Sequence, residues 1–345
     1  MSTRRISVVL PVYNEAENIQ TSLRGLWASL KDLEHEILVC YDFEADTTLP
    51  AIAAMPDKPP SVRLVRNNIG KGAANAIRAG FAAATGDVVV TTMADLSDPP
   101  DRIPALAEKL RSEGLAVVAG SRYMRGGSQT GGPFLKRTFS RWAGLILRAL
   151  AGIGTHDVTS NFRAYSSSFL ASTQVESKAG FEIALELTTK AHNRGLGVGE
   201  VPSSWRDRSA GTSRFRMWKW MPNYLRWWMT AAIAPAFVWA VLLGAAAVGW
   251  YFTRAQGDRA PIHAAVVALS ALVGGAAILG LRRARGRTLA TDAVQAALWA
   301  NPWHASLVLG GSAAVDIGVT LALAAAHAWW SLGTRGVHRS DARIR

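Results

Sequence analysis

The stretch that decides the fold is Val88–Pro100, which reads VVVTTMADLSDPP. It opens with five consecutive β-branched residues, a run that is too short for a helix and typical of a strand buried on both faces. Asp95 and Asp98 follow, and two prolines then stop further strand pairing and lead into a new helix. Because ligands bind at the carboxyl ends of parallel strands, the pattern places carboxylates at the ligand-binding edge of a sheet.

Acids at such an edge suit a hard cation. Mg²⁺ usually takes one or two carboxylates together with substrate phosphates, so we predict a nucleotide-diphosphate site here, with Asp95, Ser97 and Asp98 as candidate metal ligands. The alternative is an acidic helix start at which Ser97 or Asp98 only caps the next turn. The residues of this stretch leave both interpretations open.

Strands and helices alternate along the first 210 residues. The residue pattern predicts helices over 16–33 and 70–83 and further strands over 6–12, 36–41, 62–67 and 116–121. This alternation predicts a parallel sheet with right-handed crossovers. Lys71, between two glycines at a helix start, would either reach a diphosphate or stand in solvent, and the spacing excludes a Walker A loop.

The composition divides the chain into a soluble part and a membrane part. The formal net charge is +13, and from about residue 230 onward the sequence consists largely of apolar runs. Arginine clusters beside those runs favour a membrane surface over nucleic acid as the partner. The single cysteine, Cys40, can form no internal disulfide, and the apolar run ending at Val12 is too short for a signal peptide. We therefore expect the soluble part to lie in the cytosol.

Several motifs together resemble family 2 glycosyltransferases: PVYNE at 11–15, acids at 42 and 46, GKG at 70–72 followed by Gly80-Phe81, and ADL at 94–96. The resemblance narrows to the dolichol-phosphate mannose synthase branch, which loads a sugar onto a polyprenyl phosphate. The residues that narrow it are GSRY at 120–123, TSNFR at 159–163, and Asp207-Arg208 with Gly211 and Ser213. The match covers roughly the first two thirds of the chain in unbroken order.

The resemblance implies a GT-A fold over residues 1–213, an α/β domain with a Rossmann-like, mostly parallel sheet. It implies inverting transfer of a hexose from a nucleotide-diphosphate sugar to a polyprenyl phosphate, dolichyl or undecaprenyl. It assigns donor binding to Pro11, Tyr13, Glu15, Asp42, Asp46, Lys71 and Asp95. It assigns the acceptor phosphate to Arg122, Lys136, Arg137, Ser140, Arg208 and Ser213, with Asp95, Arg122 and Arg208 as catalytic residues.

Two departures from the family pattern bear on the metal. Met93 stands where the family has the first of two acids, and Tyr41 precedes Asp42 where the family has a pair of acids. The family implies Mg²⁺ or Mn²⁺, but a thioether is a poor ligand for Mg²⁺. Asp95, with Ser97, Asp98 or water, would hold one ion through the diphosphate oxygens. The alternative is a site that has lost its donor chemistry, in a chain that serves as a membrane scaffold.

Residues 134–150 contain no acid and place apolar side chains on one helical face, at Leu135, Phe139, Trp142, Ile146 and Ala149. This pattern predicts an interfacial membrane helix over 133–151, although a basic helix packed on the sheet would show a similar one. The cations here suit the expected acceptor, because a phosphate monoester is largely ionised at neutral pH and needs fixed cations rather than a base. For any single cation, the alternative is a solvated basic face.

A second enzymatic class remains open, a processive or glycolipid-forming synthase that acts on a hydroxyl acceptor. Such an enzyme needs a general base, usually a carboxylate, for which Glu182 and Asp207 are the candidates. Asn223–Trp227 is also a near match to the Gln-x-x-Arg-Trp motif of processive synthases, with asparagine in the place of glutamine. We interpret it instead as part of a juxtamembrane interfacial helix over 214–229, where tryptophans and basic residues gather.

Three apolar spans follow this anchor, at about 231–252, 262–281 and 305–330, and a basic tail occupies 331–345. Each span reaches the roughly 20 residues needed to cross hydrocarbon. Arginines after the second span predict a multi-pass protein of the cytoplasmic membrane with its catalytic domain in the cytosol. Three crossings would put the basic tail on the opposite side, so the number of crossings stays open. Asp316 should face another helix or a subunit, which keeps a homo-oligomer open.

Overall fold

The computed structural model describes residues 4–178, 180–207 and 220–232. The chain divides into two compact units, Met1–Ala236 and Phe237–Arg345, and the described residues all belong to the first. Of the three predicted membrane spans, only residues 231 and 232 at the start of the first are described. The rest of the spans lies outside the described residues, as do the basic tail and Asp316. Within the described ranges, no helix is both long enough and apolar enough to cross a bilayer.

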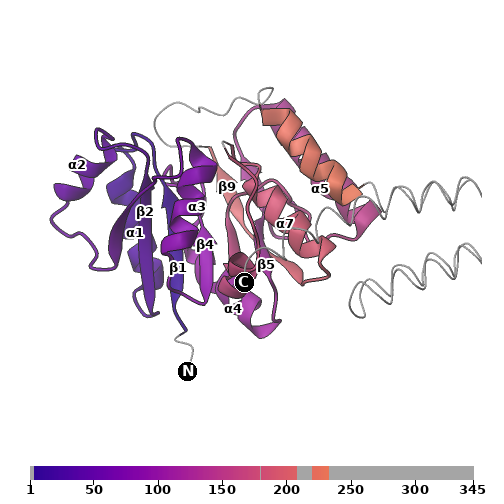
Figure 1. Ribbon diagram of the computed structural model, residues 1–345, viewed down its shortest axis with the longest axis horizontal. Coiled ribbons are helices and arrows are strands. Elements are labelled where there is room, and N and C mark those ends of the chain that lie inside the picture. The colour runs from indigo at the N-terminus through magenta and orange to yellow at the C-terminus, as the bar shows by residue number, and fades with distance from the viewer. Residues whose placement is uncertain (1–3, 179, 208–219, 233–345) are drawn as a thin grey trace, which may run out of the picture. The chain divides into compact units, whose positions relative to one another are not determined.

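A seven-stranded sheet forms the centre of the domain (Figure 1), in the order β3-β2-β1-β4-β7-β5-β8. The strands are β1 (Ile6–Pro11), β2 (His35–Tyr41), β3 (Val62–Arg66), β4 (Val88–Thr91), β5 (Val117–Ser121), β7 (Arg163–Ser166) and β8 (Val198–Pro202). The four strands from β3 to β4 are parallel, and β5 is parallel to β8. The predicted α/β fold with a mostly parallel sheet is therefore confirmed. β7, which the sequence analysis did not predict, runs antiparallel between β4 and β5.

Helices cover both faces of the sheet because its central strands carry apolar side chains in both directions. Val8 packs with helices α1 (Ile19–Leu30), α2 (Thr48–Ala53) and α4 (Ile103–Ser112), the last preceded by a 3₁₀ turn, Pro100–Arg102. Its neighbour Val9 points the other way, towards α3 (Ala73–Ala83). The short α6 (Ser167–Ala171) and α7 (Ile183–Asn193) pack beside α3 on that second face. In β4, Val88 and Val90 pack on the first face and Val89 on the second, so the β-branched run is buried on both faces, as predicted.

The segment after β5 leaves the sheet before the chain returns in β7. It contains β6 (Ser128–Thr130), which pairs with β9 (Ser204–Arg206), and the long helix α5 (Phe134–Ala151). α5 coincides with the predicted helix over 133–151, and its side chains at Leu135, Phe139, Trp142 and Ile146 are exposed. Its inner face lies close to the loop that precedes β7, since a Cβ on Gly144 would fall 1.9 Å from the carbonyl oxygen of His156.

A helix over residues 220–232 packs against α5 and α7. The indole Nε1 of Trp228 donates a hydrogen bond of 3.1 Å to the carbonyl oxygen of Ala143. Trp227 is only 5% exposed and lies beneath the cations of Lys190 and Arg226. Trp227 is buried and Trp228 is partly buried, so these two rings pack against the domain, while the predicted interfacial helix over 214–229 stays a prediction.

Candidate functional site

The carboxyl ends of β1 and β2 hold most of the predicted donor residues. Asp46 is fully buried, and its Oδ1 accepts hydrogen bonds from the backbone N–H groups of Asn14 (3.0 Å) and Thr48 (2.9 Å). Asn14 has a positive φ of 55°, a conformation that asparagine tolerates better than most residues. Oδ2 of Asp46 accepts no hydrogen bond from the described residues. A buried carboxylate oxygen without a hydrogen-bond partner destabilises the fold, so Oδ2 is a candidate acceptor for a hydrogen bond from a ligand.

Two further predicted donor residues lie in the loop that follows β1. The ring of Tyr13 is exposed and meets Phe43 edge to face, with ring centroids 5.4 Å apart. Glu15 accepts a hydrogen bond of 2.9 Å from the side chain of Asn18, and its backbone N–H donates to Thr48. Pro11 is the last residue of β1 and is buried. The fold thus gathers these residues at one sheet edge, while their contacts with a donor stay a prediction.

The carboxylate of Asp42 links three segments by hydrogen bonds: the end of β2, the loop after β3 and the start of α3. It accepts hydrogen bonds from the side chain of Asn67 (2.7 Å) and from the backbone N–H of Gly72 (2.8 Å). Gly72 has a φ of 120°, which side chains rarely adopt, so the glycine is required there. The exposed Lys71 is thereby carried beside the end of β2 at the start of α3.

Asp95 and Asp98 form an acidic pair at the end of β4. Asp95 is buried, and its Oδ1 accepts a hydrogen bond of 3.1 Å from the backbone N–H of Ser97. Leu96 between them has a φ of 61°, which is unusual for a bulky side chain. Burial, together with the negative charge of Asp95, raises the pKa of Asp98 to about 7. The negative charge of Asp95 therefore disfavours the ionised form of Asp98, and a bound cation would relieve that cost.

These residues fit a divalent cation that takes few protein ligands. Within the described ranges, no group of three or more His, Cys, Asp or Glu side chains could hold a metal. Mg²⁺ sites commonly use one or two carboxylates and complete the coordination with substrate phosphates and water. Asp95 and Asp98 match that pattern, and the thioether of Met93 is not needed for it.

Arg122 occupies the other side of the site, directly after β5. Its Nε donates to Oδ2 of Asp157 at 2.6 Å and its Nη2 to Oδ1 at 2.9 Å, which makes a bidentate ion pair. Nη2 also donates to Ser140 (3.1 Å) and Thr159 (2.9 Å). Burial alone would lower the pKa of Arg122, but Asp157 raises it above its ordinary value, so the guanidinium stays charged. The hydroxyl of Tyr123 donates to Ser140 at 3.0 Å and closes the cluster.

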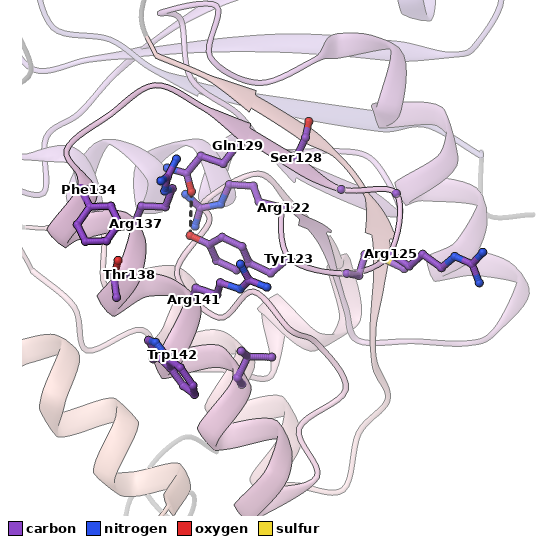
Figure 2. Close-up of a pocket in the computed structure, with 14 residues that line it drawn as sticks. Arg122, Tyr123, Arg125, Ser128, Gln129, Phe134, Arg137, Thr138, Arg141 and Trp142 are labelled. Atoms are coloured by element: carbon purple, nitrogen blue, oxygen red, sulfur yellow. Dashed lines mark hydrogen bonds between the residues drawn. The ribbon is translucent and has the colours of Figure 1, made fainter.

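Next to this cluster lies a pocket of about 690 Å³ between the loop 122–129 and α5 (Figure 2). Among the residues that the structure describes, four arginines line it, at positions 122, 125, 137 and 141, and no acid does. Phe134, Trp142 and Leu145 add apolar surface along α5. Figure 2 shows Arg122 and Arg137 close together beside Gln129, with Trp142 further along the helix. The pocket therefore suits a ligand with an anionic head and an apolar remainder.

The structure brings together only part of the predicted acceptor set. Arg122 and Ser140 are hydrogen bonded to each other, and Arg137 lines the pocket, with its guanidinium 5.7 Å from the ring of Phe134. Lys136 is not among the lining residues. Arg208 and Ser213 lie outside the described residues. The roles of all six stay predictions.

Several residues of the pocket and of the neighbouring Arg122 cluster were not predicted from the sequence. Arg141 follows Arg137 by four positions, and this spacing on a helix could have placed both on one face. Arg125 lies in the loop between β5 and β6 and carries no comparable signal. Asp157 is separated from Arg122 by 35 positions, so only the fold reveals their pairing.

The comparisons with known proteins agree with this geometry. Residues 7–172 match the model of Glycosyl transferase family 2. The chain is 33% identical over 224 residues to a dolichol-phosphate mannosyltransferase of Pyrococcus furiosus, a match that covers 64% of this chain and 62% of that protein. It is 32% identical over 220 residues to a polyprenol monophosphomannose synthase of Mycolicibacterium smegmatis, covering 61% of this chain and 81% of that protein. An undecaprenyl-phosphate mannosyltransferase of Micrococcus luteus is 29% identical over 237 residues, with 66% and 95% covered.

Solved structures support the fold. A glucosyl-3-phosphoglycerate synthase from Mycobacterium tuberculosis, in complex with Mn²⁺, uridine diphosphate and glucosyl-3-phosphoglycerate, superposes with a TM-score of 0.50 at 20% identity. The superposition covers 66% of this chain and 80% of that one. A second structure, described as a mycobacterial protein, gives a TM-score of 0.52 at 21% identity, with 66% and 75% covered. These likenesses confirm the GT-A fold that the sequence predicted.

Proposed function

The chain belongs to glycosyltransferase family 2, and we propose that it transfers one hexose from a nucleotide-diphosphate sugar to a polyprenyl phosphate with inversion at the sugar carbon. One observation carries the choice of acceptor. In the described part of the chain, the pocket beside Arg122 is lined by four arginines and no acid, with aromatic and aliphatic side chains along α5. A lipid phosphate combines an anionic head with an apolar chain. Mannose is the first sugar to test, because the curated relatives are named for mannosyl transfer.

In the proposed reaction the phosphate oxygen attacks the anomeric carbon while the bond from that carbon to the diphosphate oxygen breaks. The leaving nucleoside diphosphate takes the electron pair, and the new sugar phosphodiester keeps the acceptor oxygen. The acceptor is already ionised at neutral pH and needs no base. The protein's part is to hold two anions in line, with Arg122, Arg137 and their neighbours on the acceptor. A divalent cation held by Asp95 and Asp98 would neutralise charge on the leaving diphosphate.

A hydroxyl acceptor has less support. Glu182 is 1% exposed and does not line the pocket, so it is poorly placed to take a proton from a sugar hydroxyl there. Asp207 is exposed at the end of β9, and it too is absent from the pocket lining. No observation favours a donor-site-degenerate scaffold, since Asp95 and Asp98 keep carboxylates at the sheet edge despite Met93.

We further propose that the domain works at the cytosolic face of the cytoplasmic membrane. The exposed apolar side chains of α5 support contact with the membrane interface, and Leu225 and Met229 of the helix over 220–232 are exposed as well. The apolar spans after residue 230 would anchor the chain as a multi-pass protein. The proposal includes a homo-oligomer only because Asp316, in the third apolar span, should face another helix or a subunit.

The test is label transfer by the full-length protein from a nucleotide sugar into a lipid that organic solvent extracts, with and without Mg²⁺ or Mn²⁺. Asp95→Ala and Arg208→Ala should abolish transfer while expression persists. The exposed Asp101 and Arg148 supply matched controls, and Asp101→Ala and Arg148→Ala should retain it. The product should be labile in mild acid, as a sugar phosphodiester is. Transfer that survives Asp95→Ala, or a product that resists acid, would contradict the proposal.

A further inference from the structure

We propose that Asp157 is a positioning residue for the acceptor phosphate, which it serves by fixing the guanidinium of Arg122 so that one nitrogen, Nη1, is left for the ligand. This inference rests on the proposed function, because Arg122 meets a phosphate only if the acceptor carries one. Asp157 does not line the pocket and would act through Arg122 alone.

The contact between the two side chains determines the plane of the guanidinium. Both oxygens of Asp157 are engaged, at 2.6 Å by Nε and at 2.9 Å by Nη2, and Oδ2 also accepts the backbone N–H of Arg122 at 3.2 Å. The side chain of Asp157 is fully buried and that of Arg122 is 11% exposed. A two-pronged pair of this kind restricts rotation of the arginine head, which a lysine at 122 would not experience in the same way.

Asp157 is itself held in place from behind. Oδ1 accepts backbone N–H groups from Thr159 (3.3 Å) and Ser160 (3.1 Å). Arg163, fully buried at the start of β7, donates Nη2 to the backbone carbonyl of Asp157 and Nη1 to the hydroxyl of Thr188 on α7 (2.6 Å). Burial would raise the pKa of Asp157, but the positive charge and hydrogen bonds of Arg122 lower it, so the carboxylate stays ionised. The ion pair of Asp157 and Arg122 is therefore anchored to the sheet and to α7.

The remaining nitrogen of Arg122, Nη1, is the candidate donor to the ligand. Nε and Nη2 are used by Asp157, Ser140 and Thr159, whereas Nη1 donates to no residue that the structure describes. Because Arg122 lines the pocket, its unused donors are available to an anion there. Asp157 also neutralises much of the charge of Arg122. The other pocket arginines would then supply the net attraction, and Arg122 the oriented hydrogen bonds.

A double-mutant cycle on the full-length protein tests this. Asp157→Asn, Arg122→Lys and the double variant are compared for kcat and KM with farnesyl phosphate as acceptor and with the nucleotide sugar as donor. Asp157→Asn should lower kcat/KM for farnesyl phosphate by about 10- to 100-fold, the range for losing a charged hydrogen bond. The KM for the donor should stay within about twofold, because the donor site is on other strands. In the Arg122→Lys background the same change should cost less than about threefold, because Asp157 acts through Arg122.

A smaller change guards against a folding defect. Thr159→Val removes a hydroxyl that accepts from Nη2 of Arg122 at 2.9 Å, and it should affect the acceptor alone and lose its effect in the Arg122→Lys background. The inference is overturned if either change costs the same factor in both backgrounds, or if the KM for the donor rises as much as that for the acceptor. If the unmodified protein transfers nothing to farnesyl phosphate, the proposed function fails and takes this inference with it. An active protein with an additive cycle rejects the inference alone.

Discussion

The carboxylate of Asp42 accepts a hydrogen bond of 2.8 Å from the backbone N–H of Gly72, so the end of β2 holds the start of α3. The loop that this bond fixes carries Lys71. Asp42→Ala should therefore raise the KM for the nucleotide sugar by about 10- to 100-fold, the effect of losing charged hydrogen bonds, and leave the KM for the acceptor unchanged. Asp57, an exposed acid paired with Arg24, supplies the control variant Asp57→Ala. A donor KM that does not respond to Asp42→Ala would show that Lys71 does not depend on this anchor.

Two helical glycines should respond in opposite ways to alanine. At Gly144 a new Cβ would fall 1.9 Å from the carbonyl oxygen of His156, whereas at Gly25 the nearest atom is 3.5 Å away. Gly144→Ala should destabilise the protein by about 1–3 kcal/mol, because α5 must move away from the loop. Gly25→Ala should stabilise it by roughly 0.5–1 kcal/mol through helix propensity. Thermal unfolding of both variants checks this, and a stabilising Gly144→Ala would mean that α5 does not pack this closely.

Two exposed aromatic residues of α5 should differ in their effect on the acceptor. Trp142 lines the pocket and Phe139 does not, although both are exposed. Trp142→Ala should raise the KM for farnesyl phosphate roughly 30-fold, the equivalent of about 2 kcal/mol for removing a large aromatic wall. Phe139→Ala is the matched control and should change that KM less than about threefold. Equal effects of the two variants would indicate that the whole helix face, rather than the pocket, binds the lipid.

Glu182 should make the stability of the fold depend on pH. Burial, with the nearby charge of Glu186, raises the pKa of Glu182 above its ordinary value of 4.5, and Oε2 accepts no hydrogen bond from the described residues. A carboxyl whose pKa is higher in the folded state contributes its full stability at low pH and loses it as pH rises through the folded pKa. Glu182→Gln should therefore raise the melting temperature relative to the unmodified protein more at pH 8 than at pH 4.

The variant Glu182→Gln also distinguishes transfer to a phosphate acceptor from transfer to a hydroxyl acceptor. Transfer to a phosphate acceptor needs no carboxylate base, so Glu182→Gln should retain most activity with farnesyl phosphate. Loss of activity in a variant that melts normally would instead favour Glu182 as the base for a hydroxyl acceptor. The measurement at pH 4 is the internal control for the stability effect.

The sequence predicted the half of the sheet to which the donor residues are assigned, because its strands are largely apolar runs. β1, β2 and β4 are buried on both faces, and each ends in polar residues at the same edge. The direction of parallel strands then determines where Asp42 and Asp95 lie. The predicted helix over 133–151 was equally recoverable, since its apolar face repeats with helical period.

The acceptor half was harder to predict because its order depends on contacts between distant polar residues. β7 reads only RAYS, and its first residue is a buried arginine, so no apolar run announces a strand. The pairing of Arg122 with Asp157 gives no local signal. The contacts of Trp227 and Trp228 with the domain were not predicted, because tryptophans beside cations give the same sequence pattern whether they face lipid or a neighbouring helix.

The segment from 122 to 162 leaves the sheet at the end of β5 and returns in β7, which pairs with β5 itself at Val118 and Ala164. Every described residue that lines the pocket belongs to this one excursion. The excursion is also tied to β9 through β6 and to the helix over 220–232 through α5. If the proposed acceptor site is right, we expect a graft of this excursion between relatives, made together with Arg163 and these partner segments, to transfer the preference for the acceptor lipid and to leave the preference for the sugar unchanged.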